Sequence, residues 1–230
     1  MSSIRVRVTT TLTLLFALAT TACSGGSGSP ADLPQGGQVL QQASAAMRDV
    51  RSIAFSISTE GKPAVPVRSG DIKLLKSGDA EGTLQLEQAG QAIEMNFVLL
   101  GDTVHYKGLT GGYQKLPRAM VAQLYDPTAV LDPDRGIAKL LTGATGPTTE
   151  AREKIGDRDT YRIKATLPRD TAAALVPGIT QDLTGQVWVD TADHRPRRVR
   201  MRLPAAGGGT GTVTVSFTEF DVAYKIVAPK

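Results

Sequence analysis

The sequence predicts an α+β fold in which a large antiparallel sheet carries its helices on one face. Three observations support this prediction. A stretch near residue 40 has apolar residues at intervals of three and four, as one face of a helix does. Most of the later chain alternates apolar and polar residues between short turns, which indicates antiparallel strands. A central region loses this alternation and carries helical clusters instead.

The first expected elements are a helix over 39–50 and a strand that starts at Ile53. At Ile53 the period of the apolar residues changes to two, and Gly61 and Pro63 end the run. The apolar positions of the helix are Val39, Leu40, Ala43, Ala46, Met47 and Val50.

Further alternation predicts strands on both sides of the central helical region. The four before it are expected at 71–76, 82–88, 92–100 and 103–107. Between 117 and 141 the clusters predict two or three short helices. After it we expect a short helix at 170–176 and strands at 151–155, 159–165, 185–190, 197–203 and 212–224.

Residues 1–22 have the layout of a signal peptide. Arg5 and Arg7 precede an apolar run over 8–19, and small residues follow. The run is too short to cross a hydrocarbon core, which needs roughly 20 residues. Removal of this segment takes the formal charge from +4 to +2, and no basic tract with interleaved aromatics follows, so nucleic acid is not an expected partner.

Cys23 is the only cysteine and directly follows the small residues. A lone thiol in an exported protein closes no internal disulfide. Thr21-Ala22-Cys23 fits a bacterial lipobox, in which the cysteine is lipidated and becomes the new N-terminus, although Thr20 stands where a large aliphatic is usual. The alternative is an ordinary signal peptide followed by an unrelated cysteine.

The mature chain is expected to contain one domain. Residues 23–36 include a Gly/Ser-rich stretch typical of a flexible tether, and no second such linker interrupts 37–230. We therefore assign 1–22 to the signal peptide, 23–36 to the lipidated cysteine and tether, and 37–230 to the domain.

Four segments resemble the LppX, LprA, LprF and LprG lipoproteins of mycobacteria and related actinobacteria. They are 97–106, 125–141, 156–163 and 186–190, and the order, spacing and total length agree over the mature chain. The resemblance implies a half-barrel of antiparallel strands with helices around a hydrophobic cavity for the acyl tails of lipids or glycolipids. It also implies attachment to the outer face of the cell membrane, carriage of lipid across the envelope, and an efflux transporter as a possible partner.

Two apolar sets are the expected cavity wall. One lies on a single face of the strand at 92–100 and the other on the helices over it. Ordinary core packing is the alternative, because a wall and a core share one hydrophobic pattern. The residues are Ile93, Met95, Phe97, Leu99, Leu131, Ile137, Leu140 and Leu141.

Arg198, Arg200 and Arg202 share one face of a strand whose other face carries Val199, Met201 and Leu203. As a functional hypothesis, this row contacts anionic headgroups at a membrane. The alternative is a solvated edge strand whose charges discourage aggregation. The basic strand is also a departure from the family, and it leaves the class of lipid open.

Asp132 and Asp134 invite comparison with a calcium loop, but glycines stand where the fifth and twelfth positions need ligands. A helix start is the better interpretation, with Asp132 as the cap and Pro133 at the first helical position. We expect no metal and no cofactor.

The sequence contains few residues that could support catalysis. His105 and His194 are the only histidines, neither lies in a recognisable catalytic or metal motif, and His105 is expected on the wall or surface. The sequence therefore predicts a membrane-anchored lipid carrier that is not an enzyme. Two alternatives remain: an accessory lipoprotein that binds a membrane transporter or sensor without lipid, and, more distantly, an esterase of envelope lipids.

Overall fold

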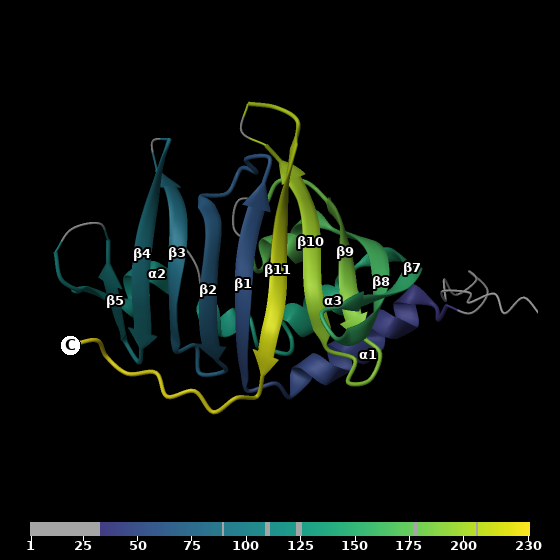
Figure 1. The fold of residues 1–230 in the computed structure, drawn as a ribbon, viewed down its shortest axis with the longest axis horizontal. Helices are drawn as coiled ribbons and strands as arrows, with labels where there is room; N and C mark the ends of the chain where they lie inside the picture. Colours follow the sequence, from purple (N-terminus) through teal and green to yellow (C-terminus); the bar gives the residue numbers. More distant parts are fainter. Residues whose placement is uncertain (1–32, 89, 109–110, 123–125, 177–178, 206) are drawn as a thin grey trace, which may run out of the picture.

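The computed structural model describes residues 33–88, 90–108, 111–122, 126–176, 179–205 and 207–230, which share a single open sheet (Figure 1). Its eleven strands are all antiparallel to their neighbours and follow the order β6-β5-β4-β3-β2-β1-β11-β10-β9-β8-β7. The edges β6 and β7 do not pair, so the sheet is not closed. The predicted α+β class with a large antiparallel sheet is confirmed.

The chain builds the sheet in two meanders that meet in the middle. After α1 (Gly36–Arg48), one half runs outward from the centre to an edge. Its strands are β1 (Ser52–Glu60), β2 (Val67–Leu75), β3 (Ala80–Gln88), β4 (Gln91–Leu100), β5 (Thr103–Lys107) and β6 (Gln114–Pro117).

Three short helical segments then carry the chain to the opposite edge, namely α2 (Arg118–Ala122), η2 (Pro127–Ala129) and α3 (Ile137–Gly143). The second meander returns to the centre, where β11 pairs with β1. Its elements are β7 (Thr145–Ile155), β8 (Arg158–Leu167), α4 (Arg169–Ala173), β9 (Leu183–Asp190), β10 (Pro196–Pro204) and β11 (Thr210–Phe220). In Figure 1, α1, α2 and α3 lie behind the sheet, so we call that face the inner face and the opposite one the outer face.

The main core lies between α1, α3 and the inner face. The buried face of α1 includes Val39, Leu40, Ala43 and Met47, as the helical spacing predicted. Of the other two predicted positions, Ala46 is half-buried and Val50 is buried beyond the end of the helix. Ser44 of α1 donates a buried hydrogen bond of 2.8 Å from Oγ to the carbonyl of Ala138 in α3. This bond fixes the two helices that cover the sheet relative to each other.

Glycines on the inner face allow large side chains to lie against the backbone. A Cβ on Gly70 would lie 2.5 Å from Leu84 Cδ2, and a Cβ on Gly185 would lie 2.2 Å from Met201 Sδ. Because glycine has no side chain, Leu84 and Met201 occupy the space that a side chain at Gly70 or Gly185 would need. Such glycines are typical of curved sheets, where the concave side is crowded.

Several strands differ from the predictions. Strand β2 begins at Val67 and not at residue 71, and β7 begins at Thr145 and not at residue 151. Strand β6 was missed because it has only four residues, of which Leu116 alone contributes an apolar side chain to the core. Strand β11 ends at Phe220 rather than at residue 224. Asp221 adopts a φ of 58°, its N–H donates to the carbonyl of Ser52, and its carboxylate accepts from the N–H of Arg51. These bonds turn the chain out of the sheet.

The predicted helix start at Asp132 is wrong in position. Its carboxylate accepts the backbone N–H groups of Asp134 and Arg135, as a cap does, and these bonds lower the pKa of the carboxyl. The segment nevertheless forms a turn, and α3 begins at Ile137, after Gly136. A Cβ on Gly136 would lie 2.2 Å from the carbonyl oxygen of Val130, so the chain makes a tight approach here before it becomes helical.

Candidate functional site

The predicted wall residues of β4 all lie on the inner face. Leu99 is buried in the main core beside Val104 of β5, and Phe97 packs against the same core. Met95 and Ile93 continue the alternation along the strand, but they are only half-buried and belong to neither cluster formed by the described residues. One strand face therefore changes along its length from core to half-buried surface.

The predicted wall residues of the connecting segments all join the core. Leu131 and Leu141 are buried, and Ile137 and Leu140 pack against the same cluster. The structure thus brings these four together with Phe97 and Leu99. They take part in core packing, which was the alternative left open by the sequence.

The half-buried part of the inner face extends over several strands. Leu84 pairs with Met95 and Leu86 pairs with Ile93, while Ile57 of β1 lies on the same face, two strands from Leu84. All are half-buried and lie outside both clusters. We call this set, Ile57, Leu84, Leu86, Ile93 and Met95, the half-buried row. Sequence reasoning missed the first three, although each alternates correctly within its own strand.

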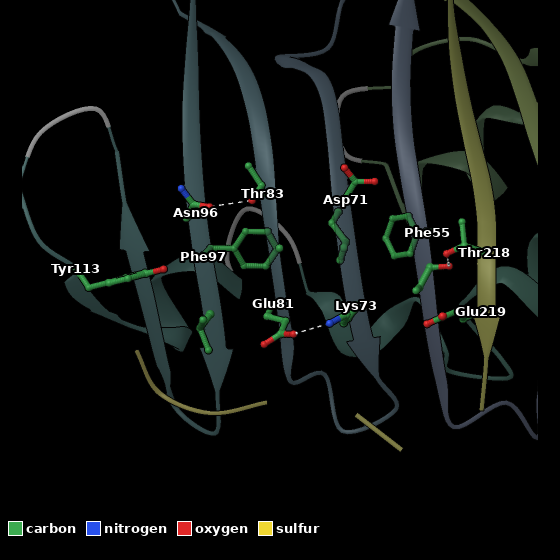
Figure 2. Close-up of a pocket in the computed structure, with 14 residues that line it drawn as sticks. Phe55, Asp71, Lys73, Glu81, Thr83, Asn96, Phe97, Tyr113, Thr218 and Glu219 are labelled. Atoms are coloured by element: carbon green, nitrogen blue, oxygen red, sulfur yellow. Dashed lines mark hydrogen bonds and ion pairs between the residues drawn. The ribbon is translucent and has the colours of Figure 1, made fainter. Parts of the chain in front are cut away.

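The outer face is polar and has a hollow of its own, of about 460 Å³ (Figure 2). Lys73 and Glu81 form an ion pair of 3.1 Å across it, and the Thr83 hydroxyl donates to Asn96 Oδ1 at 2.8 Å. These side chains alternate with the core residues of the same strands, so the hollow lies on the opposite side of the sheet from the half-buried row. Apolar residues of β1, β2 and β4 also line the hollow, namely Phe55, Ile72 and Phe97. An acyl chain there would desolvate the charged and amide groups, which is costly.

His105 also lies on the outer face, opposite Val98 of β4. Only 7% of its surface is exposed, so the prediction of a wall or surface residue is wrong.

Figure 1 shows the chain after β11 running past the ends of β1 to β4 toward β5. In that segment, burial and a hydrogen bond to Glu219 raise the pKa of Tyr224, whose ring lies under the Lys73 ammonium.

Arg198, Arg200 and Arg202 lie on the outer face of β10, as the alternation predicted. The interpretation of this strand as an edge is wrong, because β10 lies between β9 and β11 in the interior of the sheet. The guanidinium carbons of Arg198 and Arg200 lie 5.8 Å and 5.6 Å from the ring centroid of Trp188 on β9. Trp188 itself is only 4% exposed.

A buried carboxylate anchors the end of β9. Asp190 accepts hydrogen bonds from the Ala192 N–H and from Nε of Arg158 and Arg197, at 2.8 to 3.0 Å. Burial alone would raise its pKa, but these donors and the two positive charges hold the pKa below its ordinary value of 3.8. The network closes the β9–β10 turn and has a structural role.

The described residues contain no group of three or more histidine, cysteine, aspartate or glutamate side chains placed to hold a metal ion. Nor does any helix among them have the length and apolar character needed to cross a membrane. Cys23 and Tyr125 lie outside the residues that the structure describes.

Comparison with solved structures supports the fold. The LprF structure from Mycobacterium bovis has a TM-score of 0.73 at 21% identity and covers 89% of this chain and 99% of its own. LppX from Mycobacterium tuberculosis has a TM-score of 0.62 at 19% identity and covers 83% and 97%. The half-barrel architecture implied by the resemblance is thereby confirmed.

Sequence relatives cover nearly the same length. A protein named lipoarabinomannan carrier protein LprG from Mycolicibacterium smegmatis is 29% identical over 214 residues, 88% of this chain and 90% of the relative. Its namesake from Mycolicibacterium hassiacum is 31% identical over 201 residues, 84% and 85% of the two chains. These relatives are named as carriers, in agreement with the prediction that the chain is not an enzyme. Residues 35–225 match the family described as LppX_LprAFG lipoprotein, and the chain therefore belongs to that family.

Proposed function

We propose that this protein binds the acyl chains of a lipid or glycolipid against the inner face of its sheet and carries it across the cell envelope. The observation that supports this most directly is the half-buried row. Apolar residues of β1, β3 and β4 share one face outside the two described clusters, with Gly70 of β2 between Ile57 and Leu84. Buried cores of the same sheet lie directly beside it, so the row is held in a rigid frame.

Energetics favour an acyl chain as the occupant of this surface. Each methylene sheltered from water contributes about 0.8 kcal/mol. The aliphatic side chains of the row can contact an acyl chain without leaving any of their own groups in need of a hydrogen bond. In the outer hollow, an acyl chain would instead desolvate Lys73, Glu81 and Asn96, which is unfavourable. We therefore place the acyl chains on the inner face and not in that hollow.

The relatives suggest the ligand class, and the lipobox-like Cys23 suggests the cellular address. Proteins of similar length are named as carriers of lipoarabinomannan, a name that favours a glycolipid for this chain as well. In our proposal, acyl chains attached to Cys23 hold the protein on the outer face of the cell membrane, where two or three chains give stable attachment. A membrane efflux transporter is a candidate partner that would supply or accept the lipid.

Native mass spectrometry tests the carrier function. The domain starting at Ser24 is expressed in a mycobacterial host, and bound lipid is identified after organic extraction. We expect about one lipid per protein, and loss of it in the double variant Ile93→Gln/Met95→Gln, which makes the row polar. Glu94→Gln is the matched control, because Glu94 is exposed on the opposite face of the same strand.

Two results would contradict the proposal. A wild-type domain that stays empty when offered envelope lipids would favour the accessory role, in which a protein partner is bound without lipid. Lipid that remains in the double variant would place the acyl chains elsewhere.

Anchoring is tested separately, since Cys23→Ala should release the protein from the membrane fraction while leaving the lipid occupancy of the domain unchanged.

A further inference from the structure

The outer face of β10 carries a row of arginines that lack acidic partners. Among the described residues, every other arginine except Arg51 makes an ion pair with a carboxylate. No such pair involves Arg198, Arg200 or Arg202 within this part of the chain. Arg51 apart, the unpaired guanidinium groups of the described residues are thus gathered on one strand.

The neighbouring strand β11 places hydroxyl side chains opposite this row, at positions where carboxylates would stabilise the sheet. Arg198, Arg200 and Arg202 lie directly opposite Ser216, Thr214 and Thr212 of β11. Opposite charges at such positions stabilise a sheet, and like charges two residues apart on one strand repel each other. The row therefore keeps its positive charge at a cost to the isolated domain.

Trp188 and Arg162 complete this surface from β9 and β8. The indole lies beneath the guanidinium groups of Arg198 and Arg200, and stacking of this kind leaves the N–H donors of the exposed Arg200 available in the plane of its group. Nε of Arg198 is buried and has no hydrogen-bond partner among the described residues. The positive charge of Arg162 is neutralised by Glu150 and Glu153. Arg200 and Arg202 are exposed, as is Lys164 on the neighbouring part of β8.

The N-terminal segment joins the domain on the same half of the sheet, at the β7 edge and on the inner face. The carbonyl of Pro34 accepts a hydrogen bond of 2.7 Å from Thr149 Oγ1 of β7, which lies three strands, or about 15 Å, from β10. The segment from Cys23 to Pro34 spans at most roughly 40 Å when extended. A membrane anchor at Cys23 thus keeps this half of the molecule within roughly 40 Å of the lipid surface.

We propose that the outer face of β8 to β10, centred on Arg198, Arg200, Arg202 and Trp188, docks against an anionic phospholipid membrane. The proposal rests on the Cys23 anchor of the proposed function and goes beyond it, because it assigns an orientation to the anchored domain. Charge complementarity supplies the attraction, and the position of the tether supplies the proximity. The inner face, with the half-buried row, then points away from the membrane surface.

Trp188 is the only tryptophan of the chain and reports on this surface directly. The processed full-length lipoprotein is reconstituted on vesicles of phosphatidylcholine, or of phosphatidylcholine with phosphatidylglycerol, each with a headgroup spin-labelled lipid that quenches at short range. We expect Trp188 fluorescence to be quenched several-fold more strongly on the anionic vesicles. Salt at about 1 M, where the Debye length is roughly 3 Å, should remove the difference.

The double variant Arg200→Gln/Arg202→Gln tests the row itself. Both side chains are exposed, so the fold should be retained, and Arg198 stays over the indole. Each arginine near an anionic surface changes the docking equilibrium about fivefold, so we expect a loss of about 25-fold. Arg51→Gln is the control, since it removes the other arginine without an ion pair in the described residues and should leave quenching unchanged.

Equal quenching on both vesicle types would overturn the proposal, as would a loss in Arg51→Gln as large as in the double variant. The anchor is checked by flotation of the vesicles in a density gradient. If the wild type does not float with the phosphatidylcholine vesicles, only the assignment of Cys23 as the membrane anchor is overturned. In that case Trp188 quenching on the phosphatidylglycerol vesicles still decides whether the arginine row docks.

Discussion

Leu99 and Ile93 lie on the same strand and the same face, yet they have different surroundings. Leu99 is 4% exposed within the main core, opposite Val104 of β5, whereas Ile93 is half-buried and outside both described clusters. The difference arises from the helices, which cover one part of the inner face. An apolar strand face is therefore partly core and partly wall, and stability and binding can be altered separately.

The largest expected effect on stability is in the part of the inner face that the helical segments cover, which we call the covered part. Leu99→Ala should lower the free energy of unfolding by about 2 to 5 kcal/mol, because it leaves a cavity in a packed core. Urea unfolding followed by circular dichroism measures this change. A loss below about 1 kcal/mol would show that the core around Leu99 is as loosely packed as the row.

Acid should destabilise the covered part through Asp190, which adjoins the core residue Val189. Because its folded pKa is lowered, its contribution is fully present above the ordinary pKa of 3.8 and is lost as the pH falls through the folded value. Unfolding free energies of wild type and Asp190→Asn, compared between about pH 7 and pH 2, should converge at low pH. A constant difference across that range would contradict this assignment.

A smaller effect is expected where the two covering helices meet. Ser44→Ala removes the hydrogen bond to the Ala138 carbonyl and should cost about 1 kcal/mol. Amide hydrogen exchange should show faster opening of α1 and α3, with β4 unchanged near Ile93. Equal acceleration throughout the sheet would show that the helices and the row unfold as one unit.

The smallest effect on stability is expected in the half-buried row. Ile93→Ala should change the free energy of unfolding by less than about 1 kcal/mol, since the side chain packs against neither cluster. The same urea experiment as for Leu99→Ala measures it. If the two variants lost equal stability, the distinction between core and wall within β4 would be removed.

Local patterns in the sequence predicted much of this fold. The spacing at Val39 to Val50 found α1, and period-two alternation found every strand except β6 to within a few residues over at least part of its length. Edge strands were the weak point. β6 has too few residues to show a period, and the early part of β7 is polar, with only Pro147 and Thr149 turned inward and half-buried.

The candidate site was only partly predictable. The face of Ile93, Met95, Phe97 and Leu99 followed from alternation, but the boundary between core and wall did not, because it depends on which distant residues pack against each part of that face. The partners Leu84 and Leu86 of the row required the register between β3 and β4. That register joins residues in separate strands, and no single strand encodes it.

By itself, the sequence determined the α+β class, the lipobox-like Cys23, and the alternation that places Arg198, Arg200 and Arg202 opposite Val199 and Met201. Only the tertiary structure decided that β10 lies inside the sheet, that Trp188 lies beneath the arginines, and that Pro34 joins the same half. Periodicity is a local property of the backbone, so the sequence displays it directly. Strand order and helix cover depend on contacts between residues far apart in the chain, which only the folded arrangement brings together.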